Sequence, residues 1–439
     1  MTYEEAIEYL YKQVPSFEQQ GKDGYKPGLQ TTKALDEHFG HPHENFRSIH
    51  VAGTNGKGSV SHMLAAQLQV CGYRVGLYTS PHLIDFRERI RVNGVQIPEE
   101  YVAEFIEQEK DFFAPLKPSF FEITTAMAFK YFAEQDIDIA VIEVGLGGRL
   151  DCTNIITPIL SVITNISLDH TQLLGSSLEQ IAMEKGGIIK KGIPVVIGEA
   201  TPETRMVFDE LAKGANAPIV YAEDPVIIAK ADPLPDGSGI QYETIYGMKF
   251  KGELKGIYQK KNMNTLLYAI YTLMKLGYLC ECENPRNIEN IQKEMDEALL
   301  NVTSLTGLKG RWQTIRTNPT VVCDTGHNLA GWQYITEQLS TVKCAHMHIV
   351  FGMVDDKDIY GVMSILPKDA TYYFTKANSH RAFPESSIKV FGDQFGLNGE
   401  AYPTVEEAYK AALMAADTDD FIFVGGSTYV VADFLKSRE

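Results

Sequence analysis

The sequence predicts an α/β fold with two domains, each built on a largely parallel sheet covered by helices on both faces. Short apolar runs typical of buried strands alternate with segments of helical spacing from the N-terminal region onward. A polar stretch at residues 301–310 interrupts this alternation, which then restarts. The chain also has 439 residues, more than one ordinary domain contains. These three observations favour two doubly wound α/β domains.

The first clear unit of this fold lies at residues 48–78. Residues 48–52 are predicted to form a short buried strand, and a glycine-rich turn leads directly into a helix at 59–70. A second strand is predicted at 74–78, so the unit is a β–loop–α–β element of the parallel kind. Further elements are expected in this half of the chain, with strands at 137–143, 159–165 and 194–197 and helices at 2–10, 29–39, 119–135 and 262–276.

Residues 231–256 have a different character. Turns separate short alternating segments there, which predicts a β-rich insertion. The domain boundary is placed after residue 305, which gives domains of residues 1–305 and 306–439. In the second domain the pattern predicts strands at 320–324, 346–352, 372–375 and 421–425, and helices from about 331 and at 405–416. We therefore expect a smaller, Rossmann-like α/β domain at the C-terminal end.

The composition narrows the possible classes of function. Asp and Glu number 57 against 40 Lys and Arg, so the formal charge is −17. Such a surface repels phosphate backbones and anionic lipid, and we expect neither nucleic acid nor membrane as a partner. Residues 1–13 lack the basic and apolar regions of a secretory signal, and no segment is apolar for long enough to cross a membrane. Six scattered cysteines indicate reduced thiols, and we expect a cytoplasmic protein.

A glycine-rich loop between the first strand and its helix is typical of a phosphate site. A helix N-terminus offers unpaired N–H groups and a positive dipole end to an anion, and glycines let the backbone approach it. The pattern departs from the usual P-loop, because Val51 replaces the first glycine and Gly58 separates Lys57 from Ser59. We predict a P-loop-type ATPase domain whose nucleotide-binding residues include Gly53, Thr54, Asn55, Gly56, Lys57, Gly58 and Ser59.

This variant loop is one of several segments that occur in a specific order. They are HVAGTNGKGS, YTSPHLIDFRERIRVNG, VIEVGLGGRLDCTN, SLDHTQLLGSSLEQIAMEKGGIIK, LKGRWQ and DTGHN. Together they resemble the folylpolyglutamate synthase/dihydrofolate synthase family of Mur-ligase-like ATP-dependent amide ligases, over about residues 25–435. The resemblance implies that ATP phosphorylates a carboxylate of dihydropteroate or a reduced folate, and that the amine of L-glutamate attacks the acyl phosphate. Bacterial members are often bifunctional, so we expect both acceptors.

The resemblance also implies ligands for one or two Mg²⁺ ions. Glu143 closes a predicted strand, at the edge where α/β sheets bind ligands, and it matches a metal ligand. Ser80 matches a second ligand, and His170 matches the ligand of a second ion. Lys185 matches a lysine that reacts with CO₂ in several members of the superfamily, and the resulting carbamate offers two oxygens to the metal.

Other matched positions concern ATP and phosphate. Asn262 matches an asparagine directed at the adenine side, although Tyr258 stands where the family often has histidine. Arg311, whose planar guanidinium suits phosphate, and the strand-end Asp324 match ATP contacts. His327 is expected to orient the phosphate or the incoming glutamate. The predicted catalytic residues are Lys57, Glu143, His170, Lys185, Arg311 and His327.

The folate side is predicted from three further segments. Residues 81–94 resemble a mobile loop that lies near the pterin and the carboxylate being activated. Arg381, in a basic loop at 376–381, is expected to receive the carboxylates of glutamate. Phe121 has a ring suited to stacking on a flat pterin, while aromatic residues at helical spacing more often pack in the core. The residues matched to the pteroate pocket are Ser119, Phe120, Phe121, Glu122, Leu150, Asp151 and Cys152.

Two alternatives stay open at this point. A cell-wall ligase that adds an amino acid to a UDP-sugar precursor shares the phosphate loop, but a UDP-recognising domain of about 100 residues would be expected ahead of it. Only about 50 residues precede the loop. A regulatory module that binds nucleotide without ligase activity is the second alternative. In either of the ligase readings we expect small-molecule substrates and a monomer.

Overall fold

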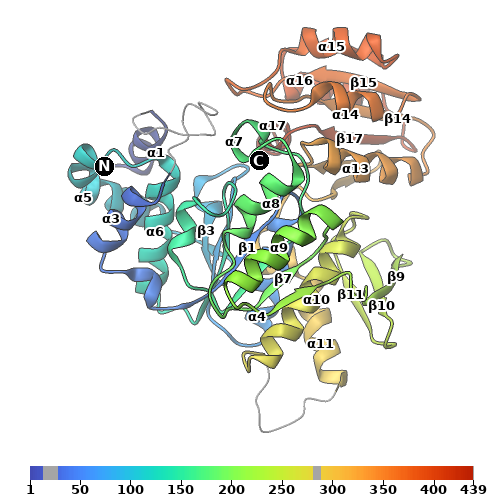
Figure 1. Cartoon of the computed structure of the whole chain (residues 1–439). Coiled ribbons are helices and arrows are strands. Elements are labelled where there is room, and N and C mark those ends of the chain that lie inside the picture. The colour runs from blue at the N-terminus through green and yellow to red at the C-terminus, as the bar shows by residue number, and fades with distance from the viewer. Residues whose placement is uncertain (13–27, 280–287, 439) are drawn as a thin grey trace. The chain divides into compact units, whose positions relative to one another are not determined.

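The computed structural model describes residues 1–12, 28–279 and 288–438. Within them the chain divides into two compact units, and each unit is described by itself (Figure 1). Unit 1 contains Met1–Glu253 and Gln259–Leu308, and unit 2 contains Leu254–Tyr258 and Lys309–Glu439. The short segment Leu254–Tyr258 therefore belongs with the C-terminal unit, although it lies inside the first domain expected from the sequence.

Unit 1 is built on an eight-stranded sheet with the order β4-β3-β2-β5-β1-β6-β7-β8. The strand β1 lies inside the sheet and pairs in parallel with β5 and β6. The carboxyl ends of these three strands therefore meet at one edge, which is where open α/β sheets bind ligands. The parallel strands are β1 Arg47–Ala52, β2 Val75–Tyr78, β5 Ile139–Glu143, β6 Leu160–Ile163, β7 Val195–Ile197 and β8 Ile219–Tyr221.

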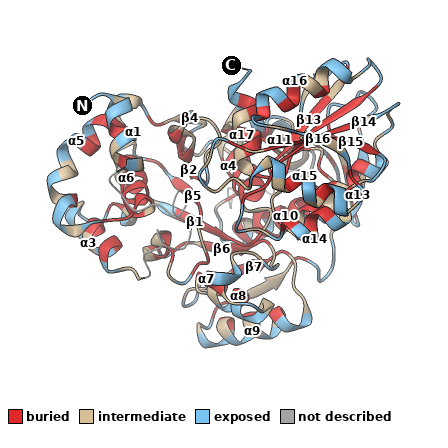
Figure 2. Ribbon diagram, turned by 90° about the horizontal axis from the view of Figure 1, so that it is seen from above, coloured by how far each residue is buried: buried red, intermediate tan, exposed pale blue. Residues whose placement is uncertain are grey.

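Helices cover both faces of this sheet. On one face α6 (Phe120–Glu134) packs against Ala140 and Ile142 of β5, and α8 (Leu178–Gly186) and α9 (Pro202–Gly214) pack against β6 and β7. Side chains alternate along a strand, so the other face is left for α4 (Lys57–Val70) and α10 (Gln259–Lys275). Figure 2 shows the buried residues gathered in the strands and on the inner sides of the helices. Other helices are α1 Tyr3–Lys12, α3 Gln30–His38, α5 Glu99–Leu116, α7 Thr171–Leu174, α11 Ile288–Leu299 and α12 Val302–Thr306.

Two antiparallel additions extend unit 1. The edge strands β3 (Ile90–Val92) and β4 (Val95–Gln96) form a hairpin whose two-residue turn, Asn93-Gly94, has positive φ at both positions. An Asn-Gly pair suits such a turn, because these residues tolerate the left-handed conformation. The predicted β-rich insertion is confirmed as a three-stranded antiparallel sheet of β9 Ile228–Pro233, β10 Ile240–Thr244 and β11 Lys249–Gly252.

Unit 2 has a six-stranded sheet with the order β12-β13-β17-β14-β15-β16, in which only β12 is antiparallel to its neighbour. Its core surrounds the fully buried Trp332, whose ring lies 5.3 Å from that of Phe351 and 5.7 Å from that of Phe423. The strands are β12 Gln313–Thr317, β13 Thr320–Asp324, β14 Met347–Phe351, β15 Ala370–Thr375, β16 Asn398–Tyr402 and β17 Phe421–Gly425. The helices are α13 Leu329–Thr341, α14 Ile359–Ile365, α15 Glu385–Gln394, α16 Val405–Ala415 and α17 Thr428–Lys436.

The predicted α/β fold class is confirmed, with parallel strands in both units. None of the helices in the described part of the chain combines the length and the apolar character that crossing a bilayer requires. The cysteines within that part, Cys71, Cys152, Cys323 and Cys344, are free thiols, and the remaining pair, Cys280 and Cys282, lies outside the described residues.

Candidate active site

The glycine-rich loop follows β1 directly and ends where α4 begins at Lys57. Two of its glycines have backbone conformations that side chains rarely adopt, with φ of 144° at Gly53 and 85° at Gly56. A Cβ on Gly53 would lie 1.9 Å from Oγ1 of Thr164, and a Cβ on Gly56 would lie 2.3 Å from Oδ1 of Asn262. Neighbouring side chains thus approach the backbone so closely that only glycine fits at these two positions.

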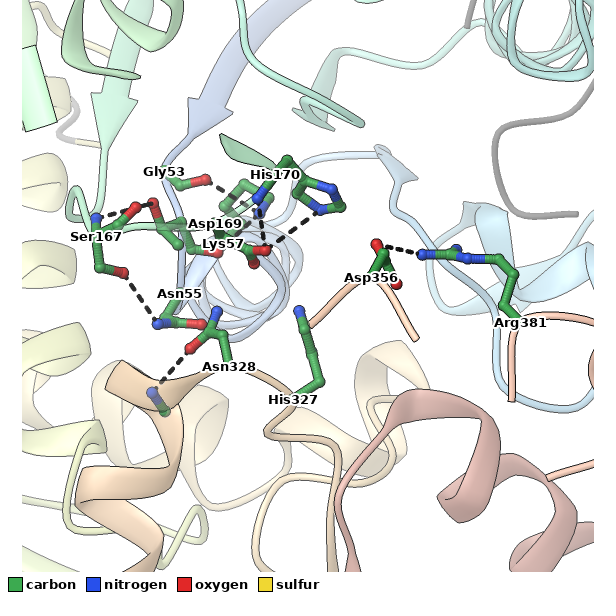
Figure 3. Close-up of polar contacts among 12 residues, drawn as sticks. Gly53, Asn55, Lys57, Ser167, Asp169, His170, His327, Asn328, Asp356 and Arg381 are labelled. Carbon is green, nitrogen blue, oxygen red and sulfur yellow. Dashed lines mark hydrogen bonds and ion pairs between the residues drawn. The ribbon is translucent and has the colours of Figure 1, made fainter. Parts of the chain in front are cut away.

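The carboxyl end of β6 supports this loop from the side. The backbone N–H of Asn55 donates to Oδ1 of Asn165 at 3.0 Å, and the hydroxyl of Thr164 donates to the carbonyl of Asn55 at 2.6 Å. The hydroxyl of Thr54 accepts from the N–H of Ser167 at 3.0 Å, a contact drawn in Figure 3. These supporting residues were missed from the sequence. They could have been found from the predicted strand at 159–165. This strand pairs in parallel with the first strand, so its carboxyl end lies beside the loop.

Two lysine side chains converge on one carbonyl oxygen of the loop. Nζ of Lys57 donates to the carbonyls of Gly53 and Thr54, both at 3.1 Å. Nζ of Lys185, from the last turn of α8, donates to the same Gly53 carbonyl at 2.7 Å, and Lys185 is buried. Two ammonium groups therefore stand at the loop, a local concentration of positive charge on a chain whose net charge is −17.

The first turn of α10 covers the other side of the loop. Nε2 of Gln259 donates to the hydroxyl of the buried Ser59 at 3.1 Å, and Oε1 of Gln259 accepts from Asn262 at 2.8 Å. The predicted nucleotide residue Asn262 thereby lies over Gly56, close to the N-terminus of α4. Gln259 was missed from the sequence, because a glutamine one helical turn before Asn262 carries no recognisable motif.

The predicted metal residues are only partly brought together. Glu143 is buried at the end of β5, directly opposite Val51 of β1, and its Oε2 accepts from the N–H of Ser80 at 3.3 Å. His170 precedes α7, and its N–H donates to Oδ1 of Asp169 at 2.8 Å (Figure 3). Within the described residues, no three His, Cys, Asp or Glu side chains are grouped as a metal site. The structure thus joins Glu143 directly to Ser80, whereas His170 is anchored by its neighbour Asp169.

The segment after Glu143 is packed tightly onto the helix that carries Lys185. A Cβ on Gly148 would lie 2.8 Å from the carbonyl oxygens of both Glu184 and Lys185. The N–H of Arg149 donates to the Glu184 carbonyl at 2.7 Å. This contact fixes the end of α8, and with it Lys185, relative to the strand that ends in Glu143.

The residues matched to the pteroate pocket are largely engaged with the chain itself. Ser119 and Glu122 form the capping box at the start of α6, with the N–H of Ser119 donating to Glu122 at 2.7 Å. Asp151 accepts from the N–H groups of Thr153 at 3.0 Å and Leu146 at 2.9 Å. Burial raises the pKa of the Asp151 carboxyl, and these hydrogen bonds oppose that rise. Such bonds shape the backbone, a role that the sequence did not indicate.

The aromatic and small residues of this group differ in exposure. Phe120 is buried in the core, whereas Phe121 is partly exposed and its ring lies over Gly145, where a Cβ would come within 2.4 Å of it. Leu150 and Cys152 are also partly exposed. Phe121 is the aromatic ring of the group that remains available to a flat ligand.

In unit 2, Asp324 and His327 lie at the end of β13 and on the turn to α13, and Arg311, which precedes β12, contacts this turn. Asp324 ends β13, and its carboxylate accepts from the hydroxyl of Tyr258 at 2.5 Å and from the N–H of Trp312 at 2.7 Å. Burial raises the pKa of Asp324, and the bond from Tyr258 opposes the rise. Arg311 donates to the hydroxyl of Thr325, and Nδ1 of His327 lies 3.1 Å from the carbonyl of the same residue.

Arg381 lies elsewhere in unit 2, after β15. Its guanidinium is paired with Asp356 at 2.6 Å (Figure 3). The guanidinium also contacts the hydroxyl of Tyr429 at 3.4 Å. Its N–H donates to Ser379 at 3.3 Å, so the loop predicted as basic is also tied to itself. The ion pair with Asp356 thus holds the guanidinium of Arg381 in place, and the arginine side chain stays partly exposed.

The fold and the phosphate loop are those of the Mur ligase class of proteins, whose family models match this chain. Residues 51–263 match the Mur ligase middle domain, and residues 310–428 match the Mur ligase, glutamate ligase domain. The dihydrofolate synthase/folylpolyglutamate synthase of Bacillus subtilis (strain 168) is 33% identical over 428 residues, which cover 94% of this chain and 96% of that protein.

Solved structures agree with this likeness. E. coli FolC in complex with DHPP and ADP has a TM-score of 0.82 and 27% identity, with 100% of this chain and 98% of that chain covered. A bifunctional folylpolyglutamate synthase/dihydrofolate synthase with Mn, AMPPNP and L-glutamate bound has a TM-score of 0.80 and 26% identity, with 100% and 98% covered. The chain belongs to the folylpolyglutamate synthase/dihydrofolate synthase family, and the predicted class of enzyme, an ATP-dependent acid–amino-acid ligase, is confirmed.

Proposed function

We propose that this chain joins L-glutamate both to dihydropteroate and to reduced folates, in each case through an acyl phosphate formed from ATP. The observation that carries the proposal is the register of β1 and β5, in which Val51 lies opposite Glu143. The buried carboxylate of Glu143 thereby stands at the same edge of the sheet as the phosphate loop. Relatives that are named for both activities support the choice of two acceptors.

The residues of the loop fit a triphosphate. The N-terminus of α4 has no side-chain cap, so the positive end of its helix dipole faces the loop, and the ammonium group of Lys57 adds positive charge. Glu143 and Ser80 fit Mg²⁺, which is usually held by one or two carboxylates together with substrate phosphates. Mg²⁺ supplies charge neutralisation on the transferring phosphoryl group. His170 is proposed as a ligand for a second ion.

The chemistry requires activation before the amide bond forms. A carboxylate is a poor electrophile, so one oxygen of the acceptor's carboxylate attacks the terminal phosphorus of ATP and ADP leaves. The amine of glutamate then attacks the acyl carbon, loses a proton, and inorganic phosphate departs with the former carboxylate oxygen. The protein's own part is to orient the reactants and to stabilise the charge on the phosphoryl oxygens, for which we propose Lys57 and Arg311.

The remaining predicted roles are part of this proposal. Asp324 and Asn262 are assigned to ATP, and His327 and Arg381 to orientation of phosphate and glutamate. Phe121 and its neighbours on α6 are assigned to the pterin, with Asp151 and Glu122 shaping the pocket through their bonds to the chain. Lys185 is proposed to carry a carbamate in the active enzyme. Its buried position at the phosphate loop supports that assignment.

One panel of assays tests the function. Phosphate release is measured with ATP, Mg²⁺ and L-glutamate in the presence of dihydropteroate, monoglutamyl tetrahydrofolate or a UDP-linked muropeptide precursor, and each product is weighed by mass spectrometry. We expect one added glutamate on the first two acceptors and no turnover of the third. Turnover of the UDP-linked acceptor alone, or nucleotide binding without phosphate release, would contradict the proposal. Lys57→Ala is the negative control, since it removes a phosphate-loop charge.

A further inference from the structure

The helix α1 contacts the loop that leads from Ser80 to Arg89, named here the 80–89 loop. This loop starts at the end of β2, where Ser80 meets Glu143, and it ends in a short 3-10 turn, Phe86–Arg89. Near its start, His82 lies between two side chains. Its Nε2 is 2.9 Å from the hydroxyl of Tyr11 on α1, and its Nδ1 accepts from Nε of Arg89 at 2.8 Å.

The direction of these bonds follows from their chemistry. An arginine guanidinium only donates, so Nδ1 of His82 is unprotonated and the ring carries its proton on Nε2. That proton is donated to the oxygen of Tyr11. Arg89 is fully buried, and its guanidinium lies 5.1 Å from the centre of the Phe120 ring. The ring of Tyr11 stacks on the same Phe120 ring at 5.3 Å, so α1, the 80–89 loop and α6 meet at His82.

A second contact lies at the other end of α1. The hydroxyl of Tyr3 donates to Oδ1 of Asp85 at 2.8 Å, and the guanidinium of Arg87 pairs with the same carboxylate at 2.8 Å and lies over the Tyr3 ring. Burial alone would raise the pKa of Asp85, but the bonds from Arg87 and Tyr3 lower it to about 2, so the carboxylate stays charged. Tyr3 and Tyr11 are eight residues apart, about 12 Å along the helix, so α1 holds the loop at two separate points.

We infer that α1 is a positioning element for the folate-type acceptor, and that Tyr3 and Tyr11 are positioning residues that act through Asp85 and His82. The inference rests on the proposed function, because it takes the pterin-bearing acceptor as the ligand beside the 80–89 loop. The loop carries Ser80 at one end and is joined to α6, which carries Phe121, through Arg89 and Phe120. Fixing His82 and Asp85 therefore fixes the backbone between the metal-ligand side and the pterin side of the site.

The test uses the full-length protein with Tyr3→Phe, Tyr11→Phe and the double variant. Phenylalanine keeps both rings and removes only the hydroxyl groups that reach the loop. Tyr9→Phe is the matched control, because Tyr9 lies on the same helix but its surroundings are Lys110 and Asp111 of α5. Each loop variant is expected to raise KM for dihydropteroate or tetrahydrofolate about fivefold, the equivalent of one lost hydrogen bond, with KM for ATP unchanged. The control is expected to match the parent.

Amide hydrogen exchange supplies a readout that does not depend on turnover. Exchange in residues 82–89 is expected to become faster in the double variant and to stay unchanged in Tyr9→Phe. Unchanged exchange, or faster exchange with an unchanged acceptor KM, would overturn the inference, and so would an equal rise of both KM values together with a lower Tm. If the parent protein shows no ligase activity, the proposed function fails, whereas the exchange result still decides whether the tyrosines hold the loop.

Discussion

The ammonium group of Lys185 donates a 2.7 Å hydrogen bond to the carbonyl of Gly53, and this bond joins the last turn of α8 to the first residue of the phosphate loop. The same carbonyl accepts from Lys57 at 3.1 Å. An uncarbamylated lysine therefore has a structural partner in the loop. Two roles for Lys185 can be separated by experiment: a charged donor to Gly53, and a carbamate that binds metal.

Lys185→Ala is expected to lower kcat by about a hundredfold or more, the order found when one charge-stabilising group is removed from an active site. If the carbamate carries the role, millimolar acetate or formate restores part of the activity, since a small carboxylate supplies the missing oxygens. Phosphate release is measured with and without these anions. Lys191→Ala, an exposed lysine a few residues further on, serves as the control. No recovery with either anion would favour the hydrogen bond to Gly53 over the carbamate.

Gly56→Ala is expected to abolish measurable ATP binding. The new Cβ would lie 2.3 Å from Oδ1 of Asn262, at a backbone φ of 85°. Gly72→Ala is a matched control, because Gly72 has a φ of 89° at the other end of α4 and a Cβ there would enter open space among the described residues. Both variants are expected to lose about 1 kcal/mol of stability from the backbone conformation. Titration calorimetry with an ATP analogue checks the prediction, and equal affinity in both variants would refute it.

Tyr258→Phe is expected to destabilise unit 2 by about 1–3 kcal/mol at pH 7, since the buried carboxylate of Asp324 loses a 2.5 Å hydrogen bond. Burial already raises the pKa of Asp324, and loss of this donor raises it further. A carboxyl group whose pKa is higher in the folded than in the unfolded protein destabilises the folded state when it is ionised. The stability lost through Tyr258→Phe is therefore expected to shrink as the pH falls and Asp324 becomes protonated. Urea unfolding at pH 7 and pH 5 measures this, with the exposed Tyr360→Phe as control.

His50 is expected to make the protein acid-sensitive. Burial lowers its pKa from 6.5 to about 3, with a smaller effect from Lys190. The unfolded chain therefore binds a proton between pH 6.5 and 3 that the folded chain excludes, and stability falls as the pH decreases through this window. The slope is about 1.4 kcal/mol per pH unit for one proton. His50→Gln is expected to reduce the slope of the unfolding free energy between about pH 4 and 6, whereas the exposed His380→Gln should leave it unchanged.

The sequence was most informative where one local segment determines both structure and chemistry. The loop from Gly53 to Ser59 could be recognised because strand, glycines, lysine and helix follow one another directly, and the structure has them in that order. Glu143 could be predicted at the sheet edge because it ends a continuous apolar strand. The short edge strands were harder to predict. β3 and β4 are only three and two residues long, and their hairpin turn was read as part of a loop.

Contacts between distant segments could not be predicted in the same way. Asn165, just after β6, and Gln259, on α10, support the phosphate loop, but neither belongs to a motif, and only the paired sheet brings them near it. The S-x-x-E pattern of Ser119 and Glu122 is typical of a capping box at a helix start. The family resemblance assigned both residues to the pteroate pocket, so their capping role was not predicted. The contact of Tyr11 with His82 joins residues 71 positions apart, beyond the reach of any local pattern.

The segment Leu254–Tyr258 has a practical consequence for protein engineering. Its backbone is bonded to Gln338, which donates to the carbonyl of Lys255 at 3.1 Å and accepts from the N–H of Ile257 at 2.8 Å. A chimera that exchanges residues 309–439 between relatives at a single crossover would thus take residues 254–258 from one parent and the surface that binds them, which includes Gln338, from the other. Chimeras that exchange residues 254–258 together with 309–439 are expected to express and fold better than chimeras that exchange 309–439 alone.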